Sequence, residues 1–484
     1  MKIKLSVVAA AIFSVCAAVA QPLPDAMKDA ARKAVVGNPE VQARWHAFLA
    51  SKEEQESVRG GFYPKIDLSA SMGLERQDRP GTTTGTFTHT NATLTLNQML
   101  FDGFFTKSEV NRLGYAKLVR YYELIDASET AALEAVRAYI DVVRARELVE
   151  LAKINYVEHR QTQEQLGKRA EAGVSRRVDL EQATGRLALA ESNLLTETNN
   201  LHDVSSRYLR IVGETPPART PAPADKFGSA ALPANVTDAL VQAFAANPAL
   251  HAAVENVRSA EGLVNSRKAP HYPRLDFKML HSLDRNLDGV RGRSSDFIAQ
   301  LVLNYNLFRG GADNARLFQA IENLNQAKEL REKACRDLRQ TLSIAYNDVQ
   351  RLKDQLEFLN QHALSTEKAR EAYRQQFDIG QRTLLDLLDT QNEYYEAARA
   401  YANARYNQII AQARTFAGMG RMMTSIEAVR PDLPAAKDVG QDKETIDPAD
   451  MCGPIAPVVA PFDAAKAMAD APPRINPPAT APSR

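Results

Sequence analysis

Tyr63-Pro64-Lys65-Ile66-Asp67 and Tyr272-Pro273-Arg274-Leu275-Asp276 are two versions of one short pattern, and they stand 209 residues apart. Asn38-Pro39 recurs at the same spacing as Asn247-Pro248. Further along, Leu100-Phe101-Asp102-Gly103 recurs as Leu307-Phe308-Arg309-Gly310 at a spacing of 207, so two residues are lost between the paired strands. Similarity at a nearly fixed spacing indicates a duplicated unit. The chain is therefore predicted to contain two copies of one structural unit.

Each copy has the same predicted order of elements, which is one helix, two strands and two further helices. Apolar residues at helical spacing predict the first helices over residues 24–59 and, in copy two, over residues 235–268. Pro64 and Pro273 follow these helices, and each proline stops the helical pattern where an extended segment starts.

The extended segments alternate apolar and polar residues. In copy one, Ile66, Leu68 and Met72 share the apolar face, and copy two repeats the pattern over residues 275–279 and 297–307. A water-filled transmembrane barrel requires such alternation, and a half-buried sheet in a soluble protein shows it as well. Because about eight strands are the fewest that close a barrel, four strands per chain imply an oligomer.

Two helical stretches of unusual length follow the strands, at about residues 104–167 and 313–377. At about 1.5 Å per residue each would reach roughly 90 Å, well beyond a globular domain. In the second stretch, apolar residues step alternately by four and three from Leu338 onward, as in a coiled coil. Each stretch breaks at a glycine and is followed by another helix, over residues 176–212 or 383–416. Two helical hairpins per chain are therefore predicted.

The two ends of the chain differ from this body. Lys2 and Lys4 precede an apolar run that closes on Ala18-Val19-Ala20, the pattern of a cleaved secretory signal peptide over residues 1–20. Val15 stands where a lipoprotein signal has a small residue, which disfavours lipidation of Cys16. Residues 423–484 are rich in proline and are predicted to be disordered or laid along the surface.

Charge and cysteine content exclude several classes of function. The net charge is +1, and it becomes −1 once the two lysines of the signal peptide are removed, so nothing favours nucleic-acid binding. Cys335 and Cys452 lack the spacing of a metal site or a disulfide framework, and both are predicted to be unpaired thiols. We find no catalytic triad order, phosphate-binding loop or zinc motif. No enzyme activity, metal or cofactor is expected.

A duplicated unit of helix, two strands and two long helices behind a signal peptide resembles the TolC family of outer-membrane channels. The resemblance covers about residues 24–420, and its most specific stretch is Phe377-Asp378-Ile379-Gly380-Gln381-Arg382-Thr383-Leu384-Leu385-Asp386-Leu387-Leu388-Asp389. It implies a mainly α fold in which three chains share one twelve-stranded transmembrane β-barrel above a helical periplasmic tunnel. The resulting divisions are the signal peptide at 1–20, a first repeat at 21–215, a linker at 216–232, a second repeat at 233–422 and the tail at 423–484.

The resemblance also implies roles for residues near the hairpin ends. Asp386 and Asp389 lie three apart on one helix face and would form two stacked acidic rings at a cation-selective periplasmic constriction. Arg382 would link to an acid on the neighbouring hairpin, with Asp179 as the matching candidate. Phe377 stands beside this link where the family often has a tyrosine. Without the resemblance, an exposed polar helix face is the favoured interpretation of the two aspartates, and an exposed arginine on such a face stays the alternative for Arg382.

Gly173 and Gly380 are the glycines at which the two hairpins are predicted to turn. A left-handed turn that ends a helix explains both residues. The resemblance implies that the same turns form the periplasmic tips, where an adaptor protein docks.

These observations predict an outer-membrane channel of a tripartite export system in a Gram-negative bacterium, serving as the exit duct for type I protein secretion. The expected partners are two further copies in a homotrimer, a periplasmic adaptor (membrane fusion) protein, an inner-membrane ABC or RND transporter, and outer-membrane lipid. Two alternatives stay open, the outer-membrane component of an RND or other multidrug efflux pump and a periplasmic coiled-coil scaffold or adaptor without a pore. The exported substrate is not legible from the sequence.

Overall fold

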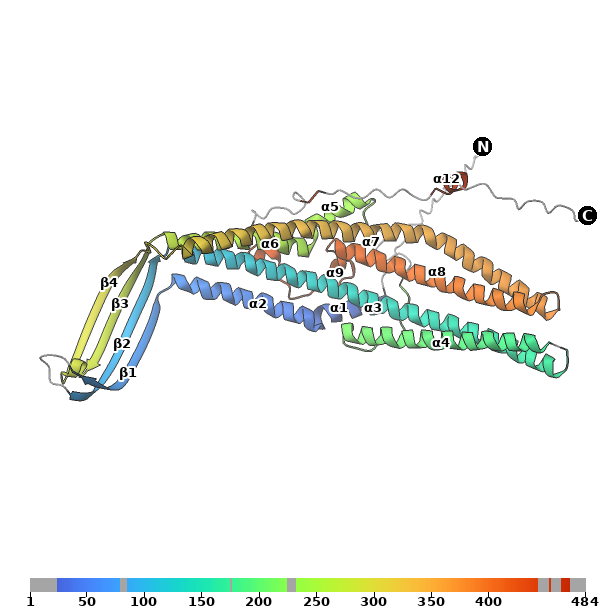
Figure 1. The fold of residues 1–484 in the computed structure, drawn as a ribbon, viewed down its shortest axis with the longest axis horizontal. Coiled ribbons are helices and arrows are strands. Elements are labelled where there is room, and N and C mark those ends of the chain that lie inside the picture. Colours follow the sequence, from blue (N-terminus) through green and yellow to red (C-terminus); the bar gives the residue numbers. More distant parts are fainter. Residues whose placement is uncertain are drawn as a thin grey trace, which may run out of the picture.

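The computed structural model describes residues 24–78, 85–174, 176–223, 232–442, 452–453 and 463–470. The predicted signal peptide with Cys16, and residues 224–231 of the predicted linker, lie outside the described residues. The described chain forms a long body, with a sheet at one end and the tips of two helical hairpins at the other (Figure 1).

The two copies have the same order of elements, as the repeats in the sequence predicted. Copy one contains α1 (Asp25–Gly37), α2 (Pro39–Arg59), β1 (Lys65–Gln77), β2 (Gly85–Phe101), α3 (Phe105–Glu171) and α4 (Arg177–Val212). Copy two contains α5 (Val236–Ala246), α6 (Pro248–Lys268), β3 (Arg274–Arg285), β4 (Arg293–Asn304), α7 (Ala312–Asp378) and α8 (Leu384–Gly418). The short helices that follow are α9 (Met422–Ser425), α10 (Ala436–Val439) and α12 (Ala464–Ala469).

Each predicted first helix is broken in two at its Asn-Pro pair, so the prediction of one continuous helix is wrong in both copies. Asn38 separates α1 from α2, and its side-chain oxygen accepts a hydrogen bond from the N–H of Glu40 at 2.9 Å. Asn247 separates α5 from α6 in the same way, through the N–H of Leu250 at 3.1 Å. Proline disfavours helix in the residue before it and is well suited to the first helical position. The Asn-Pro repeat therefore starts a new helix.

The strands form one antiparallel sheet in the order β1-β2-β3-β4. Its register sets apolar side chains of neighbouring strands opposite one another, as in Leu68 with Leu94 and Phe277 with Leu301. The predicted alternation is therefore confirmed. The apolar face is open to the surroundings in the single chain, since Leu68 and Met72 are 74% and 78% exposed.

The opposite face of the sheet carries a polar network near the end far from the helices. The His89 ring lies between two carboxylates, with Nδ1 2.7 Å from Glu75 Oε1 and Nε2 3.0 Å from Asp284 Oδ1. Asn91 donates a hydrogen bond to the same oxygen of Asp284 at 2.7 Å. This asymmetry suits a sheet with apolar surroundings on one side and water on the other.

Two helices of 67 residues each, α3 and α7, run the length of the body. At about 1.5 Å per residue each is roughly 100 Å long. α3 pairs with α4 and α7 pairs with α8, which gives the two predicted hairpins (Figure 1). The predicted end of α3 at Gly167 is wrong, because Gly167 stays helical and the chain turns at Gly173. Within the described ranges, no helix has both the length and the apolar character needed to cross a bilayer.

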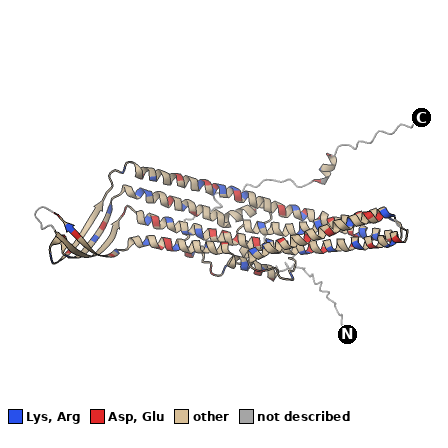
Figure 2. Ribbon diagram, turned by 60° about the horizontal axis from the view of Figure 1, so that its bottom comes forward, with Lys and Arg blue, Asp and Glu red and all other residues tan. Residues whose placement is uncertain are grey.

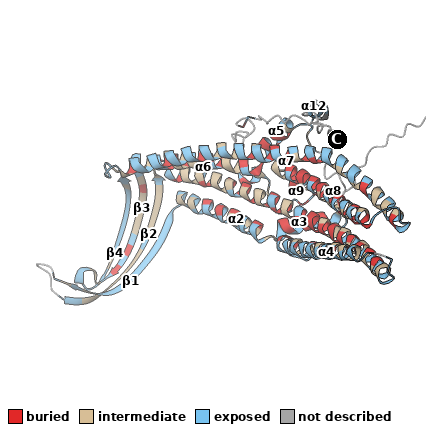
Figure 3. Cartoon of the chain, turned by 45° about the vertical axis from the view of Figure 1, so that its right-hand side comes forward, coloured by how far each residue is buried: buried red, intermediate tan, exposed pale blue. Residues whose placement is uncertain are grey.

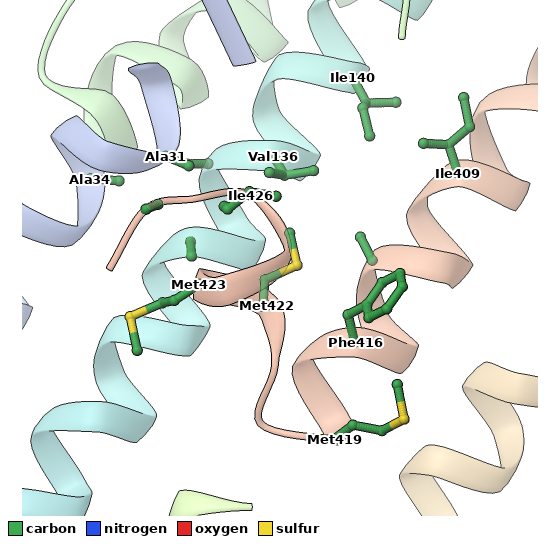
Figure 4. Packing of buried hydrophobic residues seen from close by; sticks show 14 of the residues in the cluster. Ala31, Ala34, Val136, Ile140, Ile409, Phe416, Met419, Met422, Met423 and Ile426 are labelled. Carbon is green, nitrogen blue, oxygen red and sulfur yellow. The ribbon is translucent and has the colours of Figure 1, made fainter. Parts of the chain in front are cut away.

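The largest apolar cluster lies in the middle of the body, where the shorter helices α1, α5 and α9 pack against the long ones (Figure 3). It draws on both copies, since its fully buried side chains include Tyr139 from copy one and Tyr406 and Phe416 from copy two. The small residues Ala31 and Ala34 let α1 lie close to α3 (Figure 4). The two repeats therefore share one core.

The chain after α8 packs on this core, so of the two states predicted for the tail, disordered or laid along the surface, the described residues adopt an ordered path along the body. Met422 and Ile426 are buried in the main cluster (Figure 4). The segment then runs along α3, where the Tyr121 hydroxyl donates to the Pro434 carbonyl at 2.7 Å. We call residues 419–442 together with residues 452–453 the C-terminal strap.

Cys335 of α7 and Cys452 of the C-terminal strap form a disulfide bond, so the prediction of two unpaired thiols is wrong. The two cysteines are 117 positions apart in the sequence, and both are buried. Arg339, one turn further along α7, donates to the Gly453 carbonyl at 2.8 Å. The prediction failed because it treated the tail as free, whereas the docked strap carries Cys452 to α7.

Candidate functional site

The two hairpins end in turns of the same geometry, 207 residues apart. In the first, Gly173 has φ +71°, and the N–H of Val174 closes the turn on a carbonyl of α3 at 2.9 Å. In the second, Gly380 has φ +78°, and the N–H of Gln381 closes on a carbonyl of α7 at 2.8 Å. A left-handed residue ends each helix and reverses the chain, and glycine adopts that conformation without steric strain. The prediction of helix-ending glycines is confirmed.

A small apolar cluster holds the two tips together. Its members, which we call the tip cluster, are Leu166, Ala183, Phe377, Leu384, Leu387 and Leu388. They come from α3, α4, α7 and α8, so the cluster joins both hairpins. Phe377 is buried in it, and the guanidinium of Arg169 lies 5.6 Å from the centre of the Phe377 ring. Within one chain, Phe377 is therefore an apolar contact between the hairpins.

Asp386 lies in the first turn of α8 and forms a capping box with Thr383. Its carboxylate accepts hydrogen bonds from the Thr383 hydroxyl at 2.8 Å and from the Thr383 N–H at 3.2 Å. These two hydrogen bonds, with a smaller effect of the positive charge of Arg382, hold the pKa of Asp386 below its ordinary value. Asp386 is therefore a charged carboxylate at neutral pH.

Arg382 is held by groups of its own hairpin. Its guanidinium lies over the Tyr373 ring at 4.4 Å from the centre, and Nε donates to the Gln376 side chain at 3.0 Å. Its ion pair with Asp386, one turn along, is long at 4.0 Å. Among the described residues no ion pair joins Arg382 to Asp179. The single chain thus does not bring these two predicted partners together.

Asp389 has a partner that the sequence did not suggest. Arg186 of α4 donates to Asp389 Oδ1 at 2.6 Å, so this ion pair joins the first hairpin to the second. The two residues are 203 positions apart. No pattern in a single sequence connects residues so distant, and only the packing of α4 beside α8 reveals the pair.

Further from the tips, a second set of polar contacts crosses between the hairpins. Arg370 of α7 donates to Glu158 of α3 at 2.8 Å, and its guanidinium lies 4.0 Å from the centre of the Tyr394 ring. Both members of this ion pair are mostly shielded from water. Burial lowers the pKa of the neighbouring His159, which favours its neutral form.

The tips therefore combine a few apolar contacts with ion pairs that water can reach. Basic and acidic residues lie close together along the ribbons at this end of the body (Figure 2). Exposed ion pairs contribute about 0–1 kcal/mol each, because water and salt compete with them. Such a joint is suited to reversible separation by a binding partner.

Comparison with known families identifies the chain. The family model described as "Outer membrane efflux protein" matches residues 30–214 and 239–421, one range in each repeat. The chain belongs to the outer membrane efflux protein family. Members of this family are channel proteins by fold, and the predicted resemblance to TolC is confirmed.

Individual relatives match this family member over most of their length. The outer membrane efflux protein BepC of Brucella suis is 24% identical over 404 residues, covering 83% of this chain and 86% of BepC. The outer membrane protein TolC of Escherichia coli is 23% identical over 405 residues and 81% of each chain. The alkaline protease secretion protein AprF of Pseudomonas aeruginosa is 26% identical over 404 residues, covering 79% of this chain and 81% of AprF.

Solved structures of outer-membrane channels share the fold of this efflux family member. The Campylobacter jejuni CmeC channel superposes with a TM-score of 0.73 at 14% identity, covering 85% of this chain and 91% of CmeC. The OprN channel superposes with a TM-score of 0.72 at 17% identity, covering 82% and 90%. The predicted fold of a helical tunnel joined to a β domain is confirmed, and the protein is an outer-membrane efflux channel by family.

Proposed function

We propose that this chain is the exit duct of a type I protein secretion system, in which a homotrimer works with a periplasmic adaptor and an inner-membrane ABC transporter. The observation that carries the duct is the pair of hairpin tips at the end of the body opposite the sheet. The choice of protein secretion rests on the similarity to AprF, whose name assigns it to alkaline protease secretion.

The sheet supports the homotrimer. β1 and β4 are its edge strands, and an exposed edge presents unpaired backbone N–H and C=O groups. Three copies joined edge to edge would pair these groups in one closed sheet of twelve strands. The exposed apolar face would then contact outer-membrane lipid, and the polar face with His89 would line the duct.

The tips support a gated entrance. In the trimer, Asp386 and Asp389 would form the constriction from three copies of α8. Arg382 is not bound to Asp179 within one chain, so we propose that this link forms between neighbouring chains and holds the entrance closed. Phe377 would support it by packing in the tip cluster rather than by a hydrogen bond.

Gly173 and Gly380 would present the tips to the adaptor. Apolar side chains beside these glycines are open to water, with Val174 79% and Ile379 69% exposed. Apolar residues at a projecting turn are suited to contact with a protein partner. The adaptor would therefore bind both turns and separate the hairpins.

A secretion assay tests the proposal. A Gram-negative strain without its own channel would be given this protein with the ABC transporter and adaptor of a protease secretion system. We expect the protease to appear in the medium. An RND or other multidrug efflux pump is the alternative, and the name of BepC, an outer membrane efflux protein, favours efflux. Restored drug resistance with an RND pump, without protease secretion, would decide for that alternative.

A further inference from the structure

Arg186 affects the charge of the proposed acidic constriction, because it contacts one of the two aspartates and, in the part of the chain that the structure describes, not the other. Of the two aspartates on this face of α8, Asp389 is in direct contact with a guanidinium at 2.6 Å. Among the described residues, the ion pair of Asp386 is the long 4.0 Å contact with Arg382, whose guanidinium also contacts the Tyr373 ring and the Gln376 side chain. The two carboxylates therefore differ in how far their charge is compensated.

We propose that Arg186 is a selectivity-determining residue, which cancels the charge of Asp389 while the hairpins are together and releases it when they part. The proposal rests on the proposed function, because it requires this face of α8 to line the entrance. A closed trimer would then carry one effective acidic ring, at Asp386. An open trimer would carry two.

The position of the pair supports this coupling. Arg186 comes from α4 of the first hairpin and Asp389 from α8 of the second, so their contact depends on the distance between the hairpins. Both side chains are accessible, at 31% and 55% exposure, and ions can approach either one once the contact is broken. An uncompensated carboxylate in a narrow aqueous path attracts cations and repels anions.

Comparison with a second exposed ion pair distinguishes the Arg186–Asp389 pair from an ordinary surface contact. Arg160 and Glu164 also form an exposed pair, at 3.0 Å, but both lie on α3 and stay together whatever the hairpins do. The Arg160–Glu164 pair is therefore a control, because it has the same charges and is also accessible to water but does not cross between hairpins.

Reversal potentials of the full-length trimer in planar bilayers, measured across a potassium chloride gradient, test the proposal. Arg186→Gln and Asp389→Asn both break the contact, so any widening of the entrance is common to the two variants. Arg186→Gln should raise the potassium-to-chloride permeability ratio by at least about fivefold, because one uncompensated charge at about 4 Å in water corresponds to about fivefold and each of the three chains uncovers one carboxylate. Asp389→Asn, which leaves the guanidinium unpaired, should lower that ratio.

Two further variants make the test specific. The exchanged pair Arg186→Asp with Asp389→Arg should return the ratio to the wild-type value, and Arg160→Gln should leave it unchanged. An unchanged ratio in Arg186→Gln, with a full loss of selectivity in Asp389→Asn, would overturn the proposal. A wild-type trimer that conducts no ions would instead overturn the duct itself, and this assignment with it.

Discussion

The middle of the body and the tips join the same two repeats by opposite means. In the middle, the joint consists of a shared buried core, the docked C-terminal strap and the Cys335–Cys452 disulfide. At the tips, it consists of the small tip cluster and ion pairs such as Arg186–Asp389. The first joint resists separation and the second permits it. We infer that opening of the duct is confined to the tips.

The strap shows how firmly the middle is held. Glu129 of α3 is 4% exposed, and its carboxylate accepts hydrogen bonds from the N–H groups of Met422 at 2.7 Å and Met423 at 3.3 Å. Further along, the guanidinium of Arg258 contacts both oxygens of Asp442, at 2.8 and 2.7 Å. The strap is thereby attached to helices of both repeats before it reaches the disulfide.

Removal of the disulfide should lower the stability of the protein more than any of the changes that follow. The variant with both Cys335→Ser and Cys452→Ser loses a cross-link between positions 117 apart, which corresponds to about 5 kcal/mol of stability in the chain-entropy description. Hydrogen exchange should become faster at the strap amides of Val439 and Gly440. Reduced wild-type protein should match the serine variant, whereas unchanged exchange in both would show that the strap is held without the bond.

The buried carboxylate of Glu129 should make the middle sensitive to pH. Burial raises its pKa from 4.5 to about 7, so the folded protein binds this proton more tightly than the unfolded chain does. Its contribution to stability is present below the ordinary pKa and is lost as pH rises through about 7, with a total of about 3 kcal/mol. Thermal melting from pH 5 to 8 should show this decline.

Two variants sharpen the pH test. Glu129→Gln should flatten the decline, because a neutral amide does not titrate. Glu164→Gln, which changes an exposed carboxyl of the same helix, should melt with the wild-type pH dependence. An equally steep decline in Glu129→Gln would assign the effect to another group.

Substitution of a tip glycine should act on partner binding more than on assembly. Gly380→Val places a branched side chain at φ +78°, which costs about 1–2 kcal/mol and reshapes the turn. Adaptor binding, measured by co-purification, should weaken, and the trimer should keep its size in size-exclusion chromatography. Gly185→Val, at a glycine inside α4 without a left-handed backbone, serves as the control. Loss of the trimer in Gly380→Val would assign the turn a purely structural role.

Removal of the capping box at the start of α8 should have the smallest effect on stability. Thr383→Ala removes the hydroxyl that caps the helix and hydrogen-bonds Asp386, at a cost of about 1 kcal/mol. The pKa of Asp386 should rise toward its ordinary value, since that hydroxyl is the first cause of its depression. On acidification, the stability that this carboxylate contributes is therefore lost at a higher pH in the variant than in the wild type. NMR titration of a labelled Asp386 side chain can detect this shift in its pKa. Thr383→Ser should keep the wild-type titration.

Local rules were enough to predict much of the fold. A period of two in the strands placed Leu68 and Leu94 on one face, and the repeat spacing placed Gly173 and Gly380 at equivalent turns. These features depend on neighbours in the sequence or on the duplication. The break at Asn38-Pro39 was also local, and it was missed because the helical periodicity runs across it.

Contacts that form only in the folded body could not be predicted from the sequence. Cys452 meets Cys335 only because the strap has docked, and the composition of the tail left open whether it is disordered or laid along the surface. Arg186 meets Asp389 only because α4 lies beside α8 at the tips. The sequence singled out Asp386 and Asp389, but whether their charge is compensated is a property of the tertiary structure.

Distances within the trimer test most directly whether opening is confined to the tips. Nitroxide labels carried by a ketone-bearing amino acid would be placed at Ile379, in the second tip, and at Gln340, near the disulfide on α7. Pulsed dipolar spectroscopy would compare wild-type protein with Arg186→Gln. We predict longer and broader distances at residue 379 in the variant, with superimposable distances at residue 340. A shift at residue 340 as large as that at residue 379 would contradict the account.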